Sequence, residues 1–339
     1  MLRLFFILSL FTSCAQTSYL YHQGIGQLAL EWNGRDIDDV LKDQSVSSEI
    51  KNKIIRVQKA KKYFFEYFNL KPTGIYDEIT FLKDKAVTYL VTASPKKEVK
   101  AVRFSFPFVG AFPYIGFFDK SRAAQFAKEK NNEGYSTYIR PVYAYSTLDK
   151  WIFYDNILTS FFELNDQALD QLVFHELFHT VLFVKNEVGL NENLANFFAD
   201  ELYVKYANIS EEQLINKKRQ KEKMLRLNNY IVTLVKDLSK LYKSDDRAGD
   251  IILSKFLENT FRPQIKDYCK KNGIKSCWPL RGKWNNARFA GFNTYSEKRD
   301  HIARIFKNKN LSLKDFFDYI KSKEKTFNGR TSFIDHLEK

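Results

Sequence analysis

Apolar residues recur at helical spacing in the first third of the chain. Ile54, Phe64 and Phe68 belong to one broad apolar face of a pattern with about 3.6 residues per turn. Pro72 follows shortly after that pattern and stops it, because proline cannot continue a helix. The spacing predicts a long amphipathic helix over residues 47–68.

The middle of the chain changes to a strand-like composition. Residues 86–93, 99–108 and 135–145 are rich in β-branched and aromatic side chains, which favour strands. Between the second and third of these runs, residues 120–130 have a helical pattern, and Asp119 is well placed to cap it. This part of the chain is therefore predicted to be a mixture of sheet and helix.

From residue 168 onward nearly the whole sequence is typical of helices. Turn signals separate the helical stretches near residues 185–189, 207–210, 243–246 and 271–273. A chain of 339 residues has room for about two domains or for one large α+β unit. The change in pattern indicates an N-terminal α+β region over residues 14–165 and a helical region over residues 166–339.

The first residues have the pattern of an export signal. Arg3 precedes an apolar run over residues 4–11, which is far shorter than the roughly 20 residues that span a membrane. Small residues and Cys14 follow. This resembles a bacterial lipoprotein signal, with Phe11 in place of the usual leucine. The resemblance implies that residues 1–13 are removed, that Cys14 carries lipid, and that an exported domain is anchored to a bacterial membrane, the outer one being favoured.

The cysteine count agrees with export. The chain has three cysteines, and if Cys14 carries lipid then Cys269 and Cys277 remain as a pair. The turn-prone residues 270–273 lie between them, so the two thiols can approach each other in an oxidising compartment. We expect a disulfide, and two unpaired thiols are the alternative.

The chain is strongly basic, with 54 Lys and Arg against 40 Asp and Glu and a formal net charge of +14. Such an excess can indicate nucleic acid, anionic lipid or acidic peptides as partners. The basic residues are scattered, and their densest run, residues 217–223, has glutamates within and before it in a helical stretch. A solvated helix face explains this run better than a nucleic-acid site does. The sequence also lacks a glycine-rich phosphate loop.

A histidine pair marks the candidate chemistry. His175, Glu176 and His179 form an H-E-x-x-H motif inside a strongly apolar helical run. Histidines four residues apart project from the same helical face and can reach one ion, while Glu176 can reach a water on that ion. A chance match in this chain is expected on the order of once in two hundred. The motif therefore predicts a Zn²⁺ site with Glu176 as the catalytic base.

A catalytic zinc ion needs a third protein ligand and keeps a fourth position for water. Glu192 lies near the start of a second helical pattern, residues 191–206, with Asn191 as its expected cap. The connection between the two helices is long enough for the chain to turn back, so Glu192 is the predicted third ligand. The alternative is a first-turn glutamate favoured by the helix dipole. Asn196 and Asp200 are the candidates for accepting or donating hydrogen bonds that orient the metal ligands.

The zinc motif and several other segments resemble the predicted aminopeptidase family of bacterial lipoproteins, whose zinc motif is of the gluzincin type. The matching segments are residues 19–30, 107–110, 114–119, 144–148, the H-E-x-x-H segment 175–179, the N-E-x-x-A segment 191–195, residues 285–288 and Tyr295. The resemblance implies an α+β, zincin-like (gluzincin) catalytic domain with a small mixed sheet and a helical C-terminal part. It also implies a peptide substrate. Asn196 stands where thermolysin-like gluzincins usually have aspartate.

The resemblance further implies how the site would work. Glu176 would accept a proton from the water that zinc activates, and a second donor would stabilise the oxyanion that forms at the peptide carbonyl. Tyr295 is the candidate donor, with His301 behind it. Capping or core packing is the competing explanation for both residues.

Three further residues are candidates for substrate binding. Asn285 and Asn286 could hold the substrate backbone, and Tyr145 ends the strand over residues 138–145 that would pair with the peptide. Structural roles in capping or packing are equally consistent with the sequence.

Three functions remain open from the sequence. An aminopeptidase is favoured, and an envelope endopeptidase with an open cleft is the first alternative. The second is a lipid-anchored zinc-binding protein without peptidase activity. Glu176 argues against that one, because a structural zinc site takes four protein ligands and has no use for a base.

Overall fold

The computed structural model describes residues 26, 30, 32–106, 110–143, 155–184, 187–292, 299–329 and 332–338. The chain forms two compact units that alternate along the sequence. The motif unit comprises Leu20–Val87, Tyr143–Ile209 and Ser296–Lys339, and the sheet unit includes Thr88–Val142 and Ser210–Tyr295. A single division after residue 165 does not describe this alternation, because both units draw on sequence from each side of that point.

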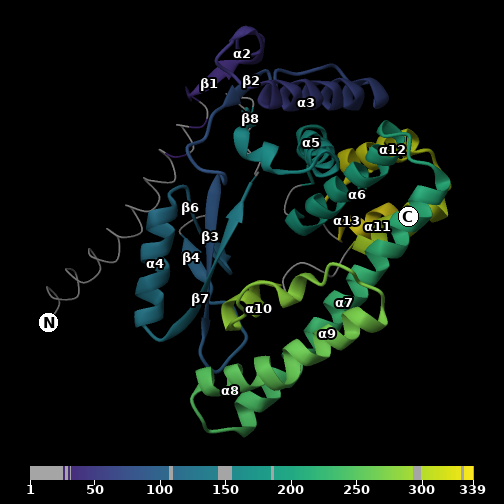
Figure 1. Ribbon diagram of the computed structural model, residues 1–339. Helices are drawn as coiled ribbons and strands as arrows, with labels where there is room; N and C mark the ends of the chain where they lie inside the picture. The colour runs from purple at the N-terminus through teal and green to yellow at the C-terminus, as the bar shows by residue number, and fades with distance from the viewer. Residues whose placement is uncertain are drawn as a thin grey trace, which may run out of the picture. The chain divides into compact units, whose positions relative to one another are not determined.

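The motif unit is mainly helical and holds one small sheet (Figure 1). Its elements are β1 (Gly34–Asp36), α2 (Ile37–Lys42), α3 (Ser48–Tyr67), β2 (Glu78–Thr80), β8 (Ile157–Leu158), the 3-10 turn η1 (Thr159–Glu163), α5 (Asp166–Val181), α6 (Val188–Tyr206), α11 (Arg299–Lys309), α12 (Leu313–Thr326) and α13 (Phe333–Glu338). In the sheet, β2 lies between an antiparallel β1 and a parallel β8.

Helix α3 confirms the helix predicted over residues 47–68. It begins after Ser47, whose hydroxyl accepts a hydrogen bond from the Ile50 amide, and it ends at Tyr67. The apolar positions Ile54 and Phe64 are fully buried, as the periodicity predicts. Packing of this face orders α3 against the rest of the motif unit.

Aromatic rings form much of the motif unit's core. Phe178 of α5 stacks on Phe198 of α6 with ring centroids 4.6 Å apart, and Phe198 in turn stacks on Phe316 of α12. Phe68, just after α3, lies 4.5 Å from Phe317 of α12. Because these rings come from several helices, α5 is held in place from more than one side.

The sheet unit combines an antiparallel sheet, a hairpin and a helical part. Its elements are β3 (Thr88–Pro95), β4 (Phe104–Phe106), β5 (Gly110–Phe112), β6 (Ile115–Phe117), α4 (Lys120–Asn132), β7 (Tyr135–Val142), α7 (Glu211–Ser244), α8 (Gly249–Phe256), the π-helical turn η2 (Leu257–Phe261), α9 (Arg262–Lys271), the 3-10 turn η3 (Trp278–Leu280) and α10 (Asn286–Phe292). Helices α4 and α10 both pack against the sheet.

Strand β3 is central in its three-stranded sheet, with β6 and β7 on its two sides. Strand β7 confirms most of the strand predicted over residues 135–145. Strand β3 is shifted slightly toward the C-terminus from the predicted residues 86–93. Of residues 99–106, only Phe104–Phe106 forms a strand, paired with β5. Helix α4 and its Asp119 cap are as predicted, since the Asp119 carboxylate accepts from the amides of Ser121 and Arg122.

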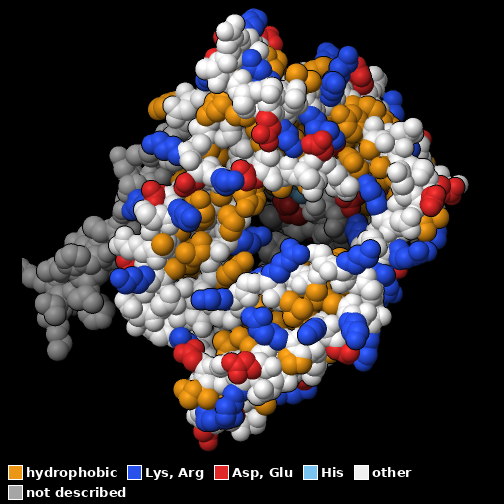
Figure 2. Space-filling model, viewed as in Figure 1, with side chains coloured by type: hydrophobic (Ala, Val, Ile, Leu, Met, Phe, Trp, Pro, Cys, Tyr) orange, Lys and Arg blue, Asp and Glu red, His pale blue; other side chains and the backbone are white. Residues whose placement is uncertain are grey.

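The helical part of the sheet unit has its own core. Leu227, Ile231 and Leu238 of α7 pack with Phe261 and Trp284. The first four turns of α7 precede this core and are largely exposed, in keeping with the solvated helix face expected at residues 217–223. Lys and Arg are spread over the face shown in Figure 2, with Asp and Glu among them.

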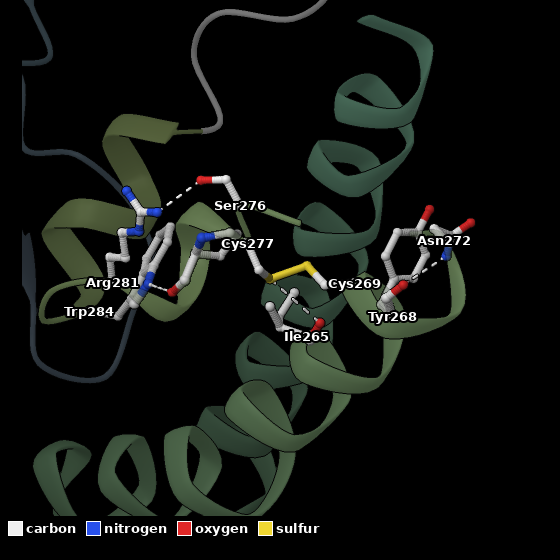
Figure 3. The surroundings of a disulfide bond; sticks show 9 residues. Ile265, Tyr268, Cys269, Asn272, Ser276, Cys277, Arg281 and Trp284 are labelled. Carbon is white, nitrogen blue, oxygen red and sulfur yellow. Dashed lines mark hydrogen bonds between the residues drawn. A yellow bond between two sulfur atoms is a disulfide. The ribbon is translucent and has the colours of Figure 1, made fainter. Parts of the chain in front are cut away.

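A disulfide joins Cys269, near the end of α9, to Cys277, just before η3 (Figure 3). This is the pairing expected from the sequence. Beside it, the Trp284 indole donates a hydrogen bond of 2.7 Å to the Pro279 carbonyl. The disulfide closes the turn around Gly273, whose φ of 61° is positive, a conformation that glycine adopts without strain.

Among the described residues, none of the helices is both long and apolar enough to cross a membrane.

Candidate metal centre

Helix α5 carries the H-E-x-x-H motif. It begins after Asn165, whose side chain accepts a hydrogen bond from the Ala168 amide, and it ends at Val181. In its second half the apolar residues Phe174, Leu177 and Phe178 are fully buried, so the polar groups of the motif lie among hydrophobic side chains. The side chains of His175 and His179 are only 16% and 8% exposed.

Helix α6 provides the third predicted ligand. It begins at Val188, three residues earlier than the sequence predicts, so Asn191 lies inside the first turn. The prediction that Asn191 caps the helix is wrong. Its side chain is instead hydrogen-bonded to the backbone of Val184, in the connection from α5. Glu192 follows directly and faces the two histidines.

The three predicted ligands converge on one point. The Nε2 atoms of His175 and His179 are 3.1 Å apart, and each lies 3.4 Å from a carboxylate oxygen of Glu192. Ligand atoms around a tetrahedral zinc ion with bonds of about 2.0 to 2.1 Å lie about 3.3 Å apart. The donor atoms are therefore spaced as three corners of such a tetrahedron.

The chemistry of the donor set also fits a metal. Two imidazole nitrogens and one carboxylate are a known ligand combination for zinc and related divalent ions. Hydrogen bonds from His175 and His179 lower the pKa of Glu192, so its carboxylate is in the ionised form that a metal requires. Among the described residues, this is the one group of three His, Cys, Asp or Glu side chains close enough together to hold a metal ion.

Glu176 lies beside this group and is almost completely buried. Burial raises the pKa of Glu176, while the charges of His175 and His179 act in the opposite direction. A carboxyl group whose pKa is raised takes up a proton more readily than an ordinary one. The position and surroundings of Glu176 therefore suit the role of a base.

Tyr76 is a neighbour of Glu176 that the sequence did not reveal. Burial raises the pKa of Tyr76, and the negative charges of Glu176 and Asp155 raise it further. Its φ of 63° is unusual for a large side chain. Hydrogen bonds from the Tyr76 amide to the Asp155 carbonyl and from Gln58 to the Tyr76 carbonyl hold this conformation. No periodic pattern in the sequence predicts that a tyrosine adopts the left-handed backbone conformation.

An ion pair with a buried carboxylate positions the motif helix and was also missed. Arg56 of α3 binds both carboxylate oxygens of Asp170 of α5, at 2.8 and 2.6 Å. Arg56 and Lys53 also bond Asp166 at the start of α5. Asp170 stands in the apolar run before the motif, and a charged residue there was a signal that a cationic partner exists.

The two predicted supporting residues have identifiable partners. Asp200 of α6 accepts a hydrogen bond of 2.7 Å from Gln171, which lies one turn before His175 on α5. This bond ties α5 to α6 close to the ligands. The Asn196 side chain donates to the Glu192 carbonyl in its own helix.

Two of the candidates for substrate binding have identifiable partners within the sheet unit. Asn286 is fully buried in the sheet unit, where it donates to the carbonyls of Pro95 and Lys96 and accepts from the Tyr242 hydroxyl. Asn285 bonds the Thr137 carbonyl and caps the start of α10. Both side chains thus have the structural roles that the sequence left as the alternative.

Of the remaining predicted residues, the structure describes only His301. Tyr145, Tyr295 and Cys14 lie outside the described residues. His301 is an exposed residue on α11.

The structure defines an α+β chain with a centre of two histidines and a glutamate on adjacent helices. The family model described as "Putative aminopeptidase" matches residues 18–331, which is most of the chain. The chain belongs to this family. No curated protein and no solved structure was found to match it.

Proposed function

We propose that the protein is a zinc-dependent peptidase of the gluzincin type, with a zincin-like catalytic domain. The observation that carries this proposal is the spacing of the donor atoms of His175, His179 and Glu192, next to the buried carboxyl group of Glu176. Membership of the aminopeptidase family supports peptide hydrolysis as the reaction. The two helices that carry these residues are adjacent in the chain, as the H-E-x-x-H and N-E-x-x-A segments require.

Each residue has a distinct part in the proposed reaction. A bound zinc ion would lower the pKa of a water molecule to roughly 7 and would polarise the scissile carbonyl. His175, His179 and Glu192 would hold the ion. Glu176 accepts the proton of the attacking water at a carboxylate oxygen and passes it to the departing amine. Its apolar surroundings exclude bulk water from this transfer.

The finer assignment is an aminopeptidase in the cell envelope of a bacterium. The family membership supports the choice of aminopeptidase over endopeptidase. The lipoprotein-like signal that ends at Cys14 and the disulfide between Cys269 and Cys277 support an exported, lipid-anchored protein, because disulfides persist in oxidising compartments.

The test combines metal content with peptide hydrolysis. The protein beginning at Ala15 is compared with Glu176→Gln and with Glu163→Gln, a control that removes an exposed glutamate of the same unit paired with Lys85. We expect one zinc ion in each. Glu176→Gln should lower kcat on a library of peptides about 10²- to 10⁴-fold, the usual contribution of a general base. The control should match the wild type.

The other outcomes select among the alternatives. Loss of hydrolysis when the peptide amino terminus is blocked identifies an aminopeptidase, and equal cleavage of blocked peptides identifies an endopeptidase. Stoichiometric zinc with no hydrolysis in any variant favours a zinc-binding lipoprotein. A wild-type protein that binds no zinc refutes the proposed site.

A further inference from the structure

Glu192 differs from the two histidines in how it is held. Its side chain is 55% exposed, whereas the side chains of His175 and His179 are largely enclosed by the core. An exposed glutamate has several rotatable bonds and few packing contacts to fix them. The position of the Glu192 backbone therefore mainly determines whether the carboxylate lies near the histidines.

The residue just before Glu192 makes an unusual pair of hydrogen bonds. The Val184 amide donates to Asn191 Oδ1 at 2.9 Å, and Asn191 Nδ2 donates to the Val184 carbonyl at 2.8 Å. The side-chain amide of Asn191 thus closes a ring with the backbone of Val184. Both residues are buried, at 2% and 1% exposure. In such surroundings a lost partner leaves a polar group without water to replace it.

This ring connects the ligands by a short path. Val184 lies five residues after His179, and Asn191 directly precedes Glu192. The Asn191 amide also bonds the Glu187 carbonyl, so the start of α6 is anchored to the same connection. The aromatic stacking of Phe178 on Phe198 holds α5 and α6 together independently of this ring. We therefore expect α5 and α6 to stay packed when the hydrogen bonds between Asn191 and Val184 are lost.

We propose that Asn191 is a positioning residue of the metal centre, whose paired hydrogen bonds with Val184 set Glu192 against His175 and His179. The proposal rests on the proposed metal-dependent function. It assigns a task to an asparagine that is neither a ligand nor a helix cap. Replacing Asn191 releases the first turn of α6, so Glu192 must be ordered at the moment when the metal binds.

The experiment compares Asn191→Ala with Glu192→Gln and Asn165→Ala. Asn165 caps the opposite end of α5, about 15 Å from His175 along the helix, so its replacement weakens the same helix without touching the α5–α6 connection. For each variant we would measure the zinc Kd against a competing chelator and the melting temperature without metal. The visible absorption of the cobalt-loaded protein reports the coordination geometry.

Asn191→Ala should raise the zinc Kd about 10- to 100-fold, as is typical when a residue that orients a ligand is removed. The cobalt bands should also change, because a loosely held carboxylate no longer fixes the geometry. Glu192→Gln should weaken binding more. Asn165→Ala should lower the melting temperature and leave the zinc Kd and the cobalt spectrum as in the wild type.

Two results would overturn the assignment to Asn191 while the proposed function stands. One is a zinc Kd for Asn191→Ala within a factor of two of the wild type. The other is an equal loss of affinity in Asn165→Ala, which would show that affinity follows the stability of α5 in general. Absence of zinc binding by the wild type would remove the proposed function, and the positioning role with it.

Discussion

Replacing Arg56 with methionine tests how the motif helix is held in place. The change keeps a long apolar stem and removes the guanidinium that bonds both carboxylate oxygens of Asp170. The Asp170 side chain is 1% exposed, so its charge would remain inside the protein without its main partner. The expected result is a large loss of stability in the motif unit.

The magnitude follows from the burial of the two partners. Removing one member of a fully buried ion pair typically costs 3–5 kcal/mol. The Arg56 side chain is 31% exposed, and water can reach the space that the guanidinium leaves. We therefore expect a loss near the lower end of that range, about 3 kcal/mol.

The loss should depend on pH in a defined direction. Burial raises the pKa of Asp170, and the hydrogen bonds and charge of Arg56 oppose that rise. Without Arg56 the folded-state pKa rises further above the unfolded value of about 3.9. Between these two pKa values the native state binds more protons than the unfolded state, so the stability of the variant falls as the pH rises.

Urea unfolding followed by circular dichroism between pH 5 and pH 8 measures both effects. Arg35→Met is the matched control, because Arg35 pairs with Asp43 on the surface and its loss should change stability little. Adding Asp170→Asn to Arg56→Met removes the titrating group and should flatten the pH dependence. The reasoning fails if Arg56→Met costs no more than the control, or if its pH dependence survives in the double variant.

Two further predictions concern the sheet unit. Replacing both Cys269 and Cys277 by serine should destabilise the sheet unit by about 2.5 kcal/mol, the chain-entropy value for cysteines eight residues apart. Denaturant unfolding with and without a reducing agent measures this loss. Equal stability of the oxidised wild type and the variant would contradict the prediction. Hydrogen bonds from Ser121 and Arg122 lower the pKa of Asp119, so this carboxylate stabilises α4 above the unfolded pKa and ceases to do so as the pH falls through the lowered folded value. Asp119→Ser keeps a capping oxygen without a titrating group, and its stability measured from pH 5 to pH 2 should fall less steeply than that of the wild type; parallel curves would show that Asp119 does not account for the acid dependence.

Local sequence signals were sufficient where a contact lies within one helix or one turn. The four-residue spacing of His175 and His179 places both rings on one face of any helix, and Asp119 caps α4 through amides two and three residues away. The apolar period of α3 likewise fixes its buried face. These features depend on backbone geometry that a few consecutive residues determine by themselves.

Tertiary contacts decided the rest. The sequence indicated Asn191 as a cap, but burial and the free backbone groups of Val184 drew its side chain into the connection between the helices, and α6 begins earlier as a result. Arg56 and Asp170 are 114 residues apart, and no local period shows which charges will pair. The structural roles of Asn285 and Asn286 and the alternation of the chain between two units have the same cause. Each depends on which distant segments pack together, because a buried polar group takes whichever partner the folded chain brings within reach.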